Sequence, residues 1–144
     1  YIELIDDAYN ANPTSVAAAL DVLASVVSPK GNQDGRHRRK IIILGDMLEL
    51  GTDEIQLHVA LAQNPHLLMA DVVHCIGPRM RACYEELPVE IRGCWAETAA
   101  EFALELDELV AAGDTVLVKG SLGSRVSMIV DLIRNLGQRS KSQA

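Results

Sequence analysis

The sequence predicts an α/β fold, a three-layer sandwich in which helices flank a mostly parallel sheet. Strand-like and helix-like segments alternate along all 144 residues, without an internal repeat or a low-complexity tract. The run Lys40–Gly45 is apolar without alternation, which is typical of a parallel strand covered on both faces. Strands and helices that alternate in this way, with right-handed crossovers, build a three-layer sandwich.

Helix and turn signals set the order of the elements. Asn12 is a good N-cap and Pro13 suits the first position of a helix, whereas Asn64 and Pro65 break a helix and Gly113 ends one. The expected strands cover residues 1–7, 40–45, 71–77, 91–95 and 115–118, and the expected helices cover residues 13–27, 53–63, 78–87, 99–110 and 126–136.

The last two helices have distinct features. Residues 98–101, Thr-Ala-Ala-Glu, form a capping-box pattern, and an inward-facing apolar stripe follows it to Val110. Gly137 begins a polar tail that we expect to fray. The sequence therefore predicts one domain over residues 1–137 and a tail over residues 138–144.

Composition and charge limit the classes of partner. A hydrophobic content of 49% with 23% charged residues favours a folded chain with a real core. The net charge of −7 makes nucleic acid and anionic membrane poor partners. The basic residues between Arg36 and Lys40 are the exception, and we interpret them as a solvated loop beside a strand rather than a binding patch.

The cysteines and the chain start indicate the cellular context. Cys75, Cys83 and Cys94 lack the CxxC spacing of a zinc or redox site, which favours a reducing cytoplasm. There is no apolar stretch of about 18 residues and no signal peptide, so we expect no membrane insertion. The chain starts with Tyr1 at the beginning of a strand, and we expect it to be a fragment of a longer protein.

Three polar loops each follow a predicted strand and should gather at the carboxyl edge of the sheet, where open α/β folds bind ligands. They span residues 7–12, 46–51 and 119–125. The first carries Asp7, Asn10 and Asn12 beside a helix start, although such residues also shape ordinary turns. No GxGxxG follows the first strand, so we do not expect NAD binding.

The sequences of these loops resemble a known family. Residues 6–13, Asp-Asp-Ala-Tyr-Asn-Ala-Asn-Pro, resemble a signature of the Mur ligases, in the MurF type, UDP-N-acetylmuramoyl-tripeptide:D-alanyl-D-alanine ligase. Two further matches follow in order: residues 44–51 with His58 after them, and residues 118–121 with Gly123 and Arg125 after them. The resemblance implies a C-terminal, Rossmann-like domain with a mixed sheet of about six strands.

The resemblance also implies roles for the first two loops. It places Asp7 on the ribose hydroxyls of ATP, with Tyr9, Asn10 and Asn12 on the nucleotide side. Asp6 should be structural, because adjacent residues on a strand point to opposite faces.

The second loop and the helix after it leave alternatives open. Asp46 and Glu49 would orient the incoming amine or a bound cation, or Asp46 would bond the backbone of its own turn. His58 falls at the family's histidine position, but a lone histidine there is also a plausible packing residue.

The third loop offers cations, hydroxyls and backbone N–H donors at a helix start. We expect Lys119, Ser121 and Arg125 to bind a carboxylate or phosphate of the substrate. The family pattern has an arginine where this sequence has Leu122, and Arg125 is a candidate substitute.

The family reaction is ATP-dependent amide formation. A carboxylate of UDP-N-acetylmuramoyl-tripeptide becomes an acyl phosphate, and the amine of D-alanyl-D-alanine attacks it. The phosphate-binding pattern GxxxxGK[ST] is not present in these 144 residues. The resemblance assigns that loop and the Mg²⁺ ligands to a central domain and the UDP-sugar to an N-terminal domain. We therefore expect the chain to be a lid that closes over the ATP site, inactive alone, with no catalytic residue and no metal ligand of its own.

Two alternatives remain. The chain is the same domain of a sister amide ligase, which adds an amino acid to a different nucleotide-peptide or to folate, or it is a non-catalytic Rossmann-like binding module. The turn Tyr9-Asn10-Ala11-Asn12 favours the MurF type.

Overall fold

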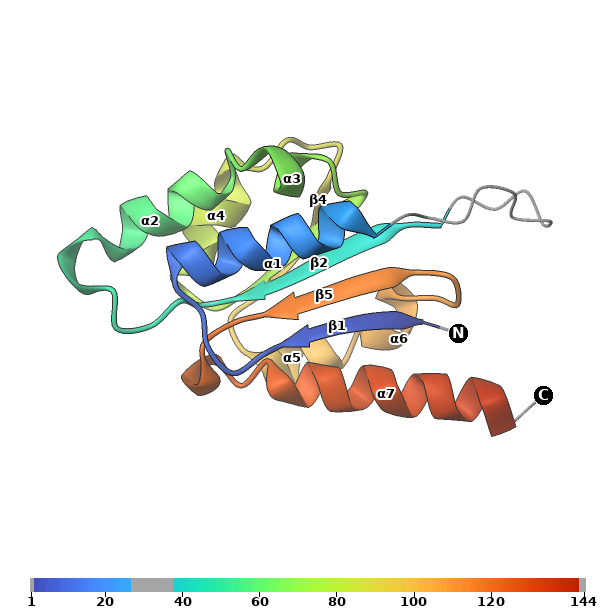
Figure 1. Ribbon diagram of the computed structural model, residues 1–144. Helices are drawn as coiled ribbons and strands as arrows, with labels where there is room; N and C mark the ends of the chain where they lie inside the picture. The colour runs from blue at the N-terminus through green and yellow to red at the C-terminus, as the bar shows by residue number, and fades with distance from the viewer. Residues whose placement is uncertain (1, 27–37, 143–144) are drawn as a thin grey trace.

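The computed structural model describes residues 2–26 and 38–142, which form a five-stranded sheet between two layers of helices (Figure 1). The strands are β1 (Glu3–Asp7), β2 (Lys40–Gly45), β3 (Val72–Ile76), β4 (Arg92–Ala96) and β5 (Thr115–Lys119). The helices are α1 (Pro13–Ser25), α2 (Glu54–Leu61), α3 (Pro65–Leu68), α4 (Met80–Glu86), α5 (Ala99–Ala103), α6 (Leu106–Leu109) and α7 (Ser127–Ser142), with 3₁₀ turns η1 (Gly51–Asp53) and η2 (Leu122–Ser124).

All strand pairings in the described sheet are parallel, in the order β1-β5-β2-β3-β4. The chain leaves β1 at one edge, builds β2, β3 and β4 outward, and returns to insert β5 between β1 and β2. The α/β sandwich is confirmed. The expected mixed sheet of about six strands is wrong for the described residues, which form five parallel strands.

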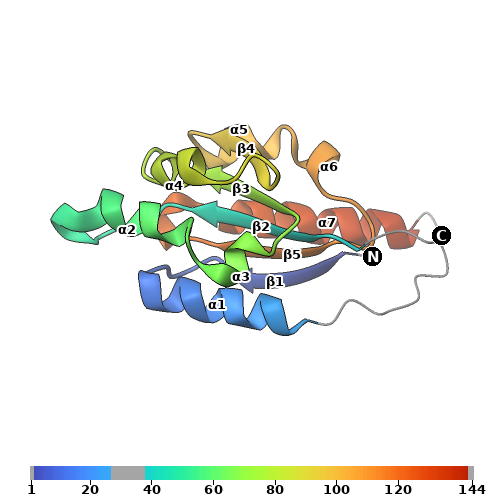
Figure 2. The same ribbon diagram turned by 90° about the horizontal axis from the view of Figure 1, so that it is seen from above.

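The two faces of the sheet have separate cores. Helices α1 to α4 cover one face, where Leu20, Ile42, Met80 and Leu117 belong to one buried hydrophobic cluster. Helices α5 to α7 cover the other face, around Phe102. Figure 2, seen from above, shows the strands side by side from β1 to β4. Because every inner strand is buried on both faces, its sequence is apolar without alternation.

Several helix limits differ from the expectation. The apolar stripe from Ala99 to Val110 does not form one helix, because 3₁₀-type bonds from Leu104 N–H to Glu101 O and from Glu105 N–H to Phe102 O separate α5 from α6. The expected helix to residue 63 ends at Leu61, and Asn64 caps the short α3. Helix α7 continues through Gly137 to Ser142, where we expected a frayed tail.

Part of the basic segment has a structural role. The guanidinium of Arg39 makes two bonds to the carboxylate of Asp114, at 3.2 and 2.9 Å, and joins the start of β2 to the start of β5. Arg36, His37 and the expected helix stop at 28–31 lie outside the described residues. No helix in the described ranges is long and apolar enough to cross a membrane.

Candidate functional site

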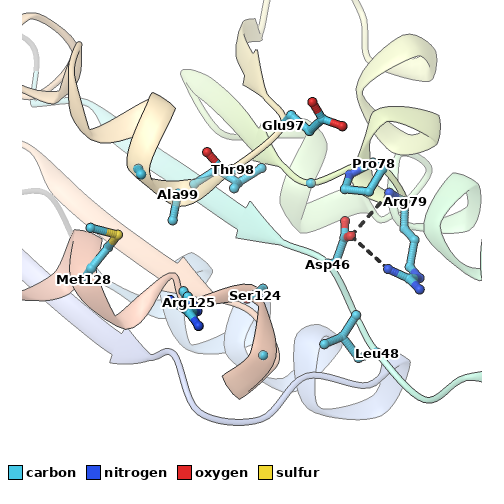
Figure 3. A pocket seen from close by; sticks show the side chains of 14 residues that line it. Asp46, Leu48, Pro78, Arg79, Glu97, Thr98, Ala99, Ser124, Arg125 and Met128 are labelled. Atoms are coloured by element: carbon cyan, nitrogen blue, oxygen red, sulfur yellow. Dashed lines mark hydrogen bonds and ion pairs between the residues drawn. The ribbon is translucent and has the colours of Figure 1, made fainter.

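A cavity of about 670 Å³ opens at the carboxyl ends of β2, β3 and β4 (Figure 3). The beginnings of α4 and α5 and the η2 turn before α7 complete its wall. The lining residues are Asp46, Leu48, Ile76, Gly77, Pro78, Arg79, Glu97, Thr98, Ala99, Ala100, Gly123, Ser124, Arg125 and Met128. Its size falls in the range of small-molecule sites, about 300–1,000 Å³.

Asp46 follows β2 and holds the start of α4. Its buried carboxylate accepts hydrogen bonds from the backbone N–H of Met80 at 2.7 Å and of Arg79 at 3.3 Å. The expected alternative, a bond to its own turn, is therefore replaced by a bond to a helix 33 residues away. Gly77 makes this possible, because its φ is +113° and a Cβ there would collide with the Asp46 carboxylate.

Arg79 is a wall residue whose charge is already engaged. Its Nε lies 2.8 Å from Glu54 and its Nη1 lies 3.4 Å from Asp46. The hydrogen bond that Arg79 donates to the carboxylate of Glu54 is the main cause that raises the pKa of Arg79 above its usual value. The residue therefore fixes the wall of the cavity and offers less free charge than an unpaired arginine.

Arg125 lies in the same cavity with a guanidinium that has no hydrogen bond or ion pair within the described residues. Its backbone is left-handed, with φ +60°, which costs a residue with a Cβ about 1 kcal/mol. The structure thus places an exposed cation at the mouth of the cavity. The hydroxyls of Thr98 and Ser124 lie in the same wall.

Ser121 ties the three predicted loops together. Its Oγ accepts a hydrogen bond from the N–H of Leu48 at 2.9 Å and lies 3.4 Å from the carbonyl oxygen of Ala11, while its own N–H donates to the carbonyl of Asp46. These contacts confirm that the loops after β1, β2 and β5 meet at one edge. They also commit the hydroxyl to partners within the protein.

Lys119 ends β5 and is paired with Asp7 at the end of β1. Its Nζ lies 2.8 Å from Oδ2 of Asp7, and its side chain is 1% exposed whereas that of Asp7 is 46% exposed. Asp6 points to the other face, where Arg134 of α7 lies 3.0 Å away. The two adjacent acids therefore have different partners, and the role expected for Asp7 on the ribose stays a prediction.

The remaining residues of the first loop divide into exposed and capping groups. Tyr9 and Asn10 are exposed beside Asp7. Asn12 forms the cap of α1, since its side chain accepts from the N–H of Ser15 at 2.8 Å and the Ser15 hydroxyl accepts from the N–H of Asn12. The predicted cap is confirmed.

His58 is fully buried and holds the second loop. Its Nε2 accepts from the N–H of Met47 at 3.0 Å, and its Nδ1 lies 2.6 Å from the carbonyl of Glu54. These contacts define a neutral ring with the proton on Nδ1. Glu49, by contrast, is exposed with φ +62°, outside the cavity wall.

Of the predicted site residues, the cavity contains Asp46 and Arg125 but not Asp7, Tyr9, Asn10, Asn12, Glu49, Lys119 or Ser121. Sequence reasoning missed Gly77, Pro78, Arg79, Glu97 and Thr98. These residues follow β3 and β4 at the same carboxyl edge. The sequence predicts both strands, so their ends could have been added to the three loops as part of the expected site. In the described parts of the chain, no group of three or more His, Cys, Asp or Glu residues is arranged to hold a metal ion.

Comparison with known proteins identifies the family. The family model described as Mur ligase, glutamate ligase domain, matches residues 1–122. The UDP-N-acetylmuramoyl-tripeptide–D-alanyl-D-alanine ligase of Rickettsia prowazekii is 34% identical over 130 residues, covering 89% of this chain and 26% of that protein. The enzyme of the same name from Treponema pallidum is 31% identical, covering 89% and 27%. The chain thus spans about a quarter of the length of these relatives.

Solved structures agree. MurF of Acinetobacter baumannii superposes with a TM-score of 0.69 at 29% identity, covering 91% of this chain and 27% of that one. The MurF ligase of Thermotoga maritima, crystallised in complex with ADP, superposes with a TM-score of 0.72 at 23% identity, covering 96% and 29%, and this likeness concerns the fold. The chain belongs to the Mur ligase family and corresponds to its glutamate ligase domain.

Proposed function

We propose that this chain is the C-terminal domain, over residues 1–137, of a cytoplasmic ligase that joins D-alanyl-D-alanine to UDP-N-acetylmuramoyl-tripeptide with ATP, in peptidoglycan precursor synthesis. The observation that carries the proposal is that a half-exposed carboxylate, Asp7, and a cavity with a free cation, Arg125, share the carboxyl edge of one sheet. The relatives that match 89% of the chain bear the name of this ligase.

The nucleotide belongs at the end of β1 in this proposal. The half-exposed carboxylate of Asp7 accepts the hydroxyls of the ATP ribose, and the exposed Tyr9 and Asn10 lie alongside. Asn12 supports this side by capping α1. Magnesium accompanies ATP in the family reaction, but we assign no magnesium ligand to the described residues.

The dipeptide belongs in the cavity. D-alanyl-D-alanine carries one carboxylate and two methyl groups, and the wall offers the guanidinium of Arg125, the hydroxyl of Thr98, and apolar contacts from Ile76, Ala99 and Met128. Asp46 and Ser121 serve this side by fixing the wall and the loops, whereas Lys119 contacts Asp7 on the nucleotide side. Glu49 is exposed outside the cavity wall, so we propose no contact between Glu49 and the dipeptide.

The chemistry needs further domains. The tripeptide carboxylate attacks the γ-phosphorus of ATP and ADP leaves, after which the dipeptide amine displaces phosphate from the acyl phosphate. These residues supply positioning and exclusion of water when the domain closes as a lid. Because the chain spans about a quarter of its relatives and contains no GxxxxGK[ST] loop, the 144 residues alone should form no amide.

The test is amide formation by the full-length enzyme with ATP, UDP-N-acetylmuramoyl-tripeptide and D-alanyl-D-alanine. Arg125→Gly keeps the left-handed backbone and removes the guanidinium, so it should raise KM for the dipeptide about tenfold or more while the KM for ATP stays within about twofold. Arg125→Lys keeps a positive charge, so its KM for the dipeptide should lie between those of wild type and Arg125→Gly.

Four outcomes separate the candidates. Turnover with D-alanyl-D-alanine and a raised dipeptide KM support both the assignment and the cavity. An unchanged dipeptide KM in Arg125→Gly removes the cavity from the proposal. Product from a single amino acid but not from the dipeptide assigns the chain to a sister ligase, and no ligase activity at all favours a non-catalytic binding module.

A further inference from the structure

The two partners of the ion pair between Lys119 and Asp7 differ in exposure, since Lys119 is buried and Asp7 is half-exposed. This difference suggests a function. The ammonium of Lys119 is almost completely removed from solvent, and its partner is Oδ2 of Asp7 at 2.8 Å. The parallel register sets Asp7 directly beside Lys119 at the ends of β1 and β5. One oxygen of the carboxylate is therefore held from inside the protein.

The other side of the same carboxylate faces outward. The Asp7 side chain is 46% exposed, and within the described residues it has no hydrogen bond or ion pair except that to Lys119. The neighbouring Asp6 is 20% exposed and is engaged by Arg134 on the opposite face. Of the two adjacent acids, Asp7 thus presents an unoccupied acceptor to the carboxyl edge of the sheet.

We infer that Lys119 is a positioning residue: it fixes the carboxylate of Asp7 in one orientation, so that the outward oxygen accepts the ribose hydroxyls of the nucleotide. This inference rests on the proposed function. Lys119 is too deeply buried to touch a ligand itself, so it replaces the direct substrate contact that the sequence predicts for this lysine. A freely rotating aspartate would have to be ordered each time nucleotide binds, which weakens binding.

The experiment compares two nucleotides on the full-length enzyme, ATP and 2′,3′-dideoxy-ATP, which lacks both hydroxyls. The measured quantity is the ratio of kcat/KM for the two. Wild type should prefer ATP at least about tenfold, since the analogue leaves a charged acceptor unpaired. In Lys119→Met the preference should fall about fivefold or more, through the KM for ATP rather than kcat.

The matched control is Arg134→Met, which removes a cation from the neighbouring acid Asp6 on the other face. It should leave the nucleotide ratio at the wild-type value. Both nucleotides are measured on one preparation, so the ratio does not depend on how much of a variant is folded. Lys119→Gln keeps a neutral donor toward Asp7 and should give an intermediate ratio.

The outcomes separate this inference from the proposed function. If Lys119→Met keeps the wild-type ratio, the positioning role is overturned while the ligase assignment stands. If wild type itself does not distinguish the nucleotides, the ribose contact and the inference both fail, although the assignment as a ligase still stands. If wild type forms no amide, the proposed function has failed first.

Discussion

His74 lies in the core on β3, where its side chain is 2% exposed and its Nδ1 accepts the N–H of Cys94 at 2.9 Å. Burial, with a smaller contribution from the charge of Arg39, lowers the pKa of His74 to about 4. The unfolded chain has the ordinary value of 6.5. At a pH between these two pKa values, His74 is protonated in the unfolded state and neutral in the folded state. Lowering the pH through this range therefore favours unfolding.

The 144-residue domain should therefore lose stability as the pH falls from about 7 to 4, by up to about 3 kcal/mol from this residue. Urea denaturation at pH 7.5 and 4.5 measures the loss. His74→Asn keeps an acceptor for Cys94 and should show a smaller difference between the two pH values. His66→Asn, at a half-exposed position, is the control, and an equal loss in His74→Asn and wild type would contradict the prediction.

Asp7→Ala has an effect on stability as well as on nucleotide binding, because it leaves the ammonium of Lys119 buried without its carboxylate. Removing one partner of a fully buried pair costs about 3–5 kcal/mol, and the half-exposed position of Asp7 reduces the expected cost to about 2 kcal/mol. Lys119→Met should cost less, and the double variant Asp7→Ala/Lys119→Met should recover much of the loss. Urea denaturation of the three variants measures these losses of unfolding free energy. If the loss in the double variant equals the sum of the two single losses, Asp7 and Lys119 do not stabilise each other.

At the scale of elements, the start of α1 is fixed by the reciprocal bonds of Asn12 and Ser15. Asn12→Ala should destabilise the domain by about 1 kcal/mol, whereas Asn12→Asp should stay within about 0.5 kcal/mol because aspartate caps equally well. Thr14→Ala, at an exposed position in the same turn, is the control for thermal denaturation. A full-stability Asn12→Ala variant would show that the cap is unimportant.

This cap was predictable from the sequence because it is local, with both partners within three residues. The same holds for Pro13 at the start of α1 and for the apolar β2 strand. The break between α5 and α6 was not predictable from periodicity, since Leu106 continues the inward stripe of Phe102 on either side of it. Periodicity reports which residues face the core, not whether the backbone between them is continuous.

The site was predictable only where its signals are local in the sequence. Motifs located the loops after β1, β2 and β5, and their meeting at Ser121 follows from parallel topology. Asp46 was singled out, but its bond to the start of α4 depends on a partner 34 residues later. Lys119 was recognised as a charge in a ligand-like loop, while its burial against Asp7 emerges only once β5 lies beside β1.

At the scale of the whole molecule, the position of β5 decides whether the sheet is continuous. It is bonded to β1 on one side and to β2 on the other, so β1 touches the rest of the sheet only through β5. A chain that ends at residue 113 lacks β5 and α7, and it should lose cooperative unfolding and the protection of its amides. A chain of residues 1–136 keeps β5 and most of α7 and should unfold in one transition.

Far-UV circular dichroism during urea denaturation, with hydrogen exchange, compares the two truncated chains. A single sharp transition in residues 1–113 would contradict the role given to β5. The order of the strands could not be read from the sequence, because the inner strands are largely apolar on both faces and give no sign of which neighbour they pair with.

The same strand order has a consequence for synthesis on the ribosome. The strand made first, β1, is the last to find its place, since its partner β5 ends 112 residues later (Lys119 minus Asp7). Strands β2, β3 and β4 can assemble earlier, but the edge of β2 that β5 will occupy stays open while the next 74 residues are made (Lys119 minus Gly45). At 5–20 residues per second, that apolar edge is exposed for roughly 4–15 s in every nascent chain, which is the interval when it is most prone to aggregate or to recruit a chaperone.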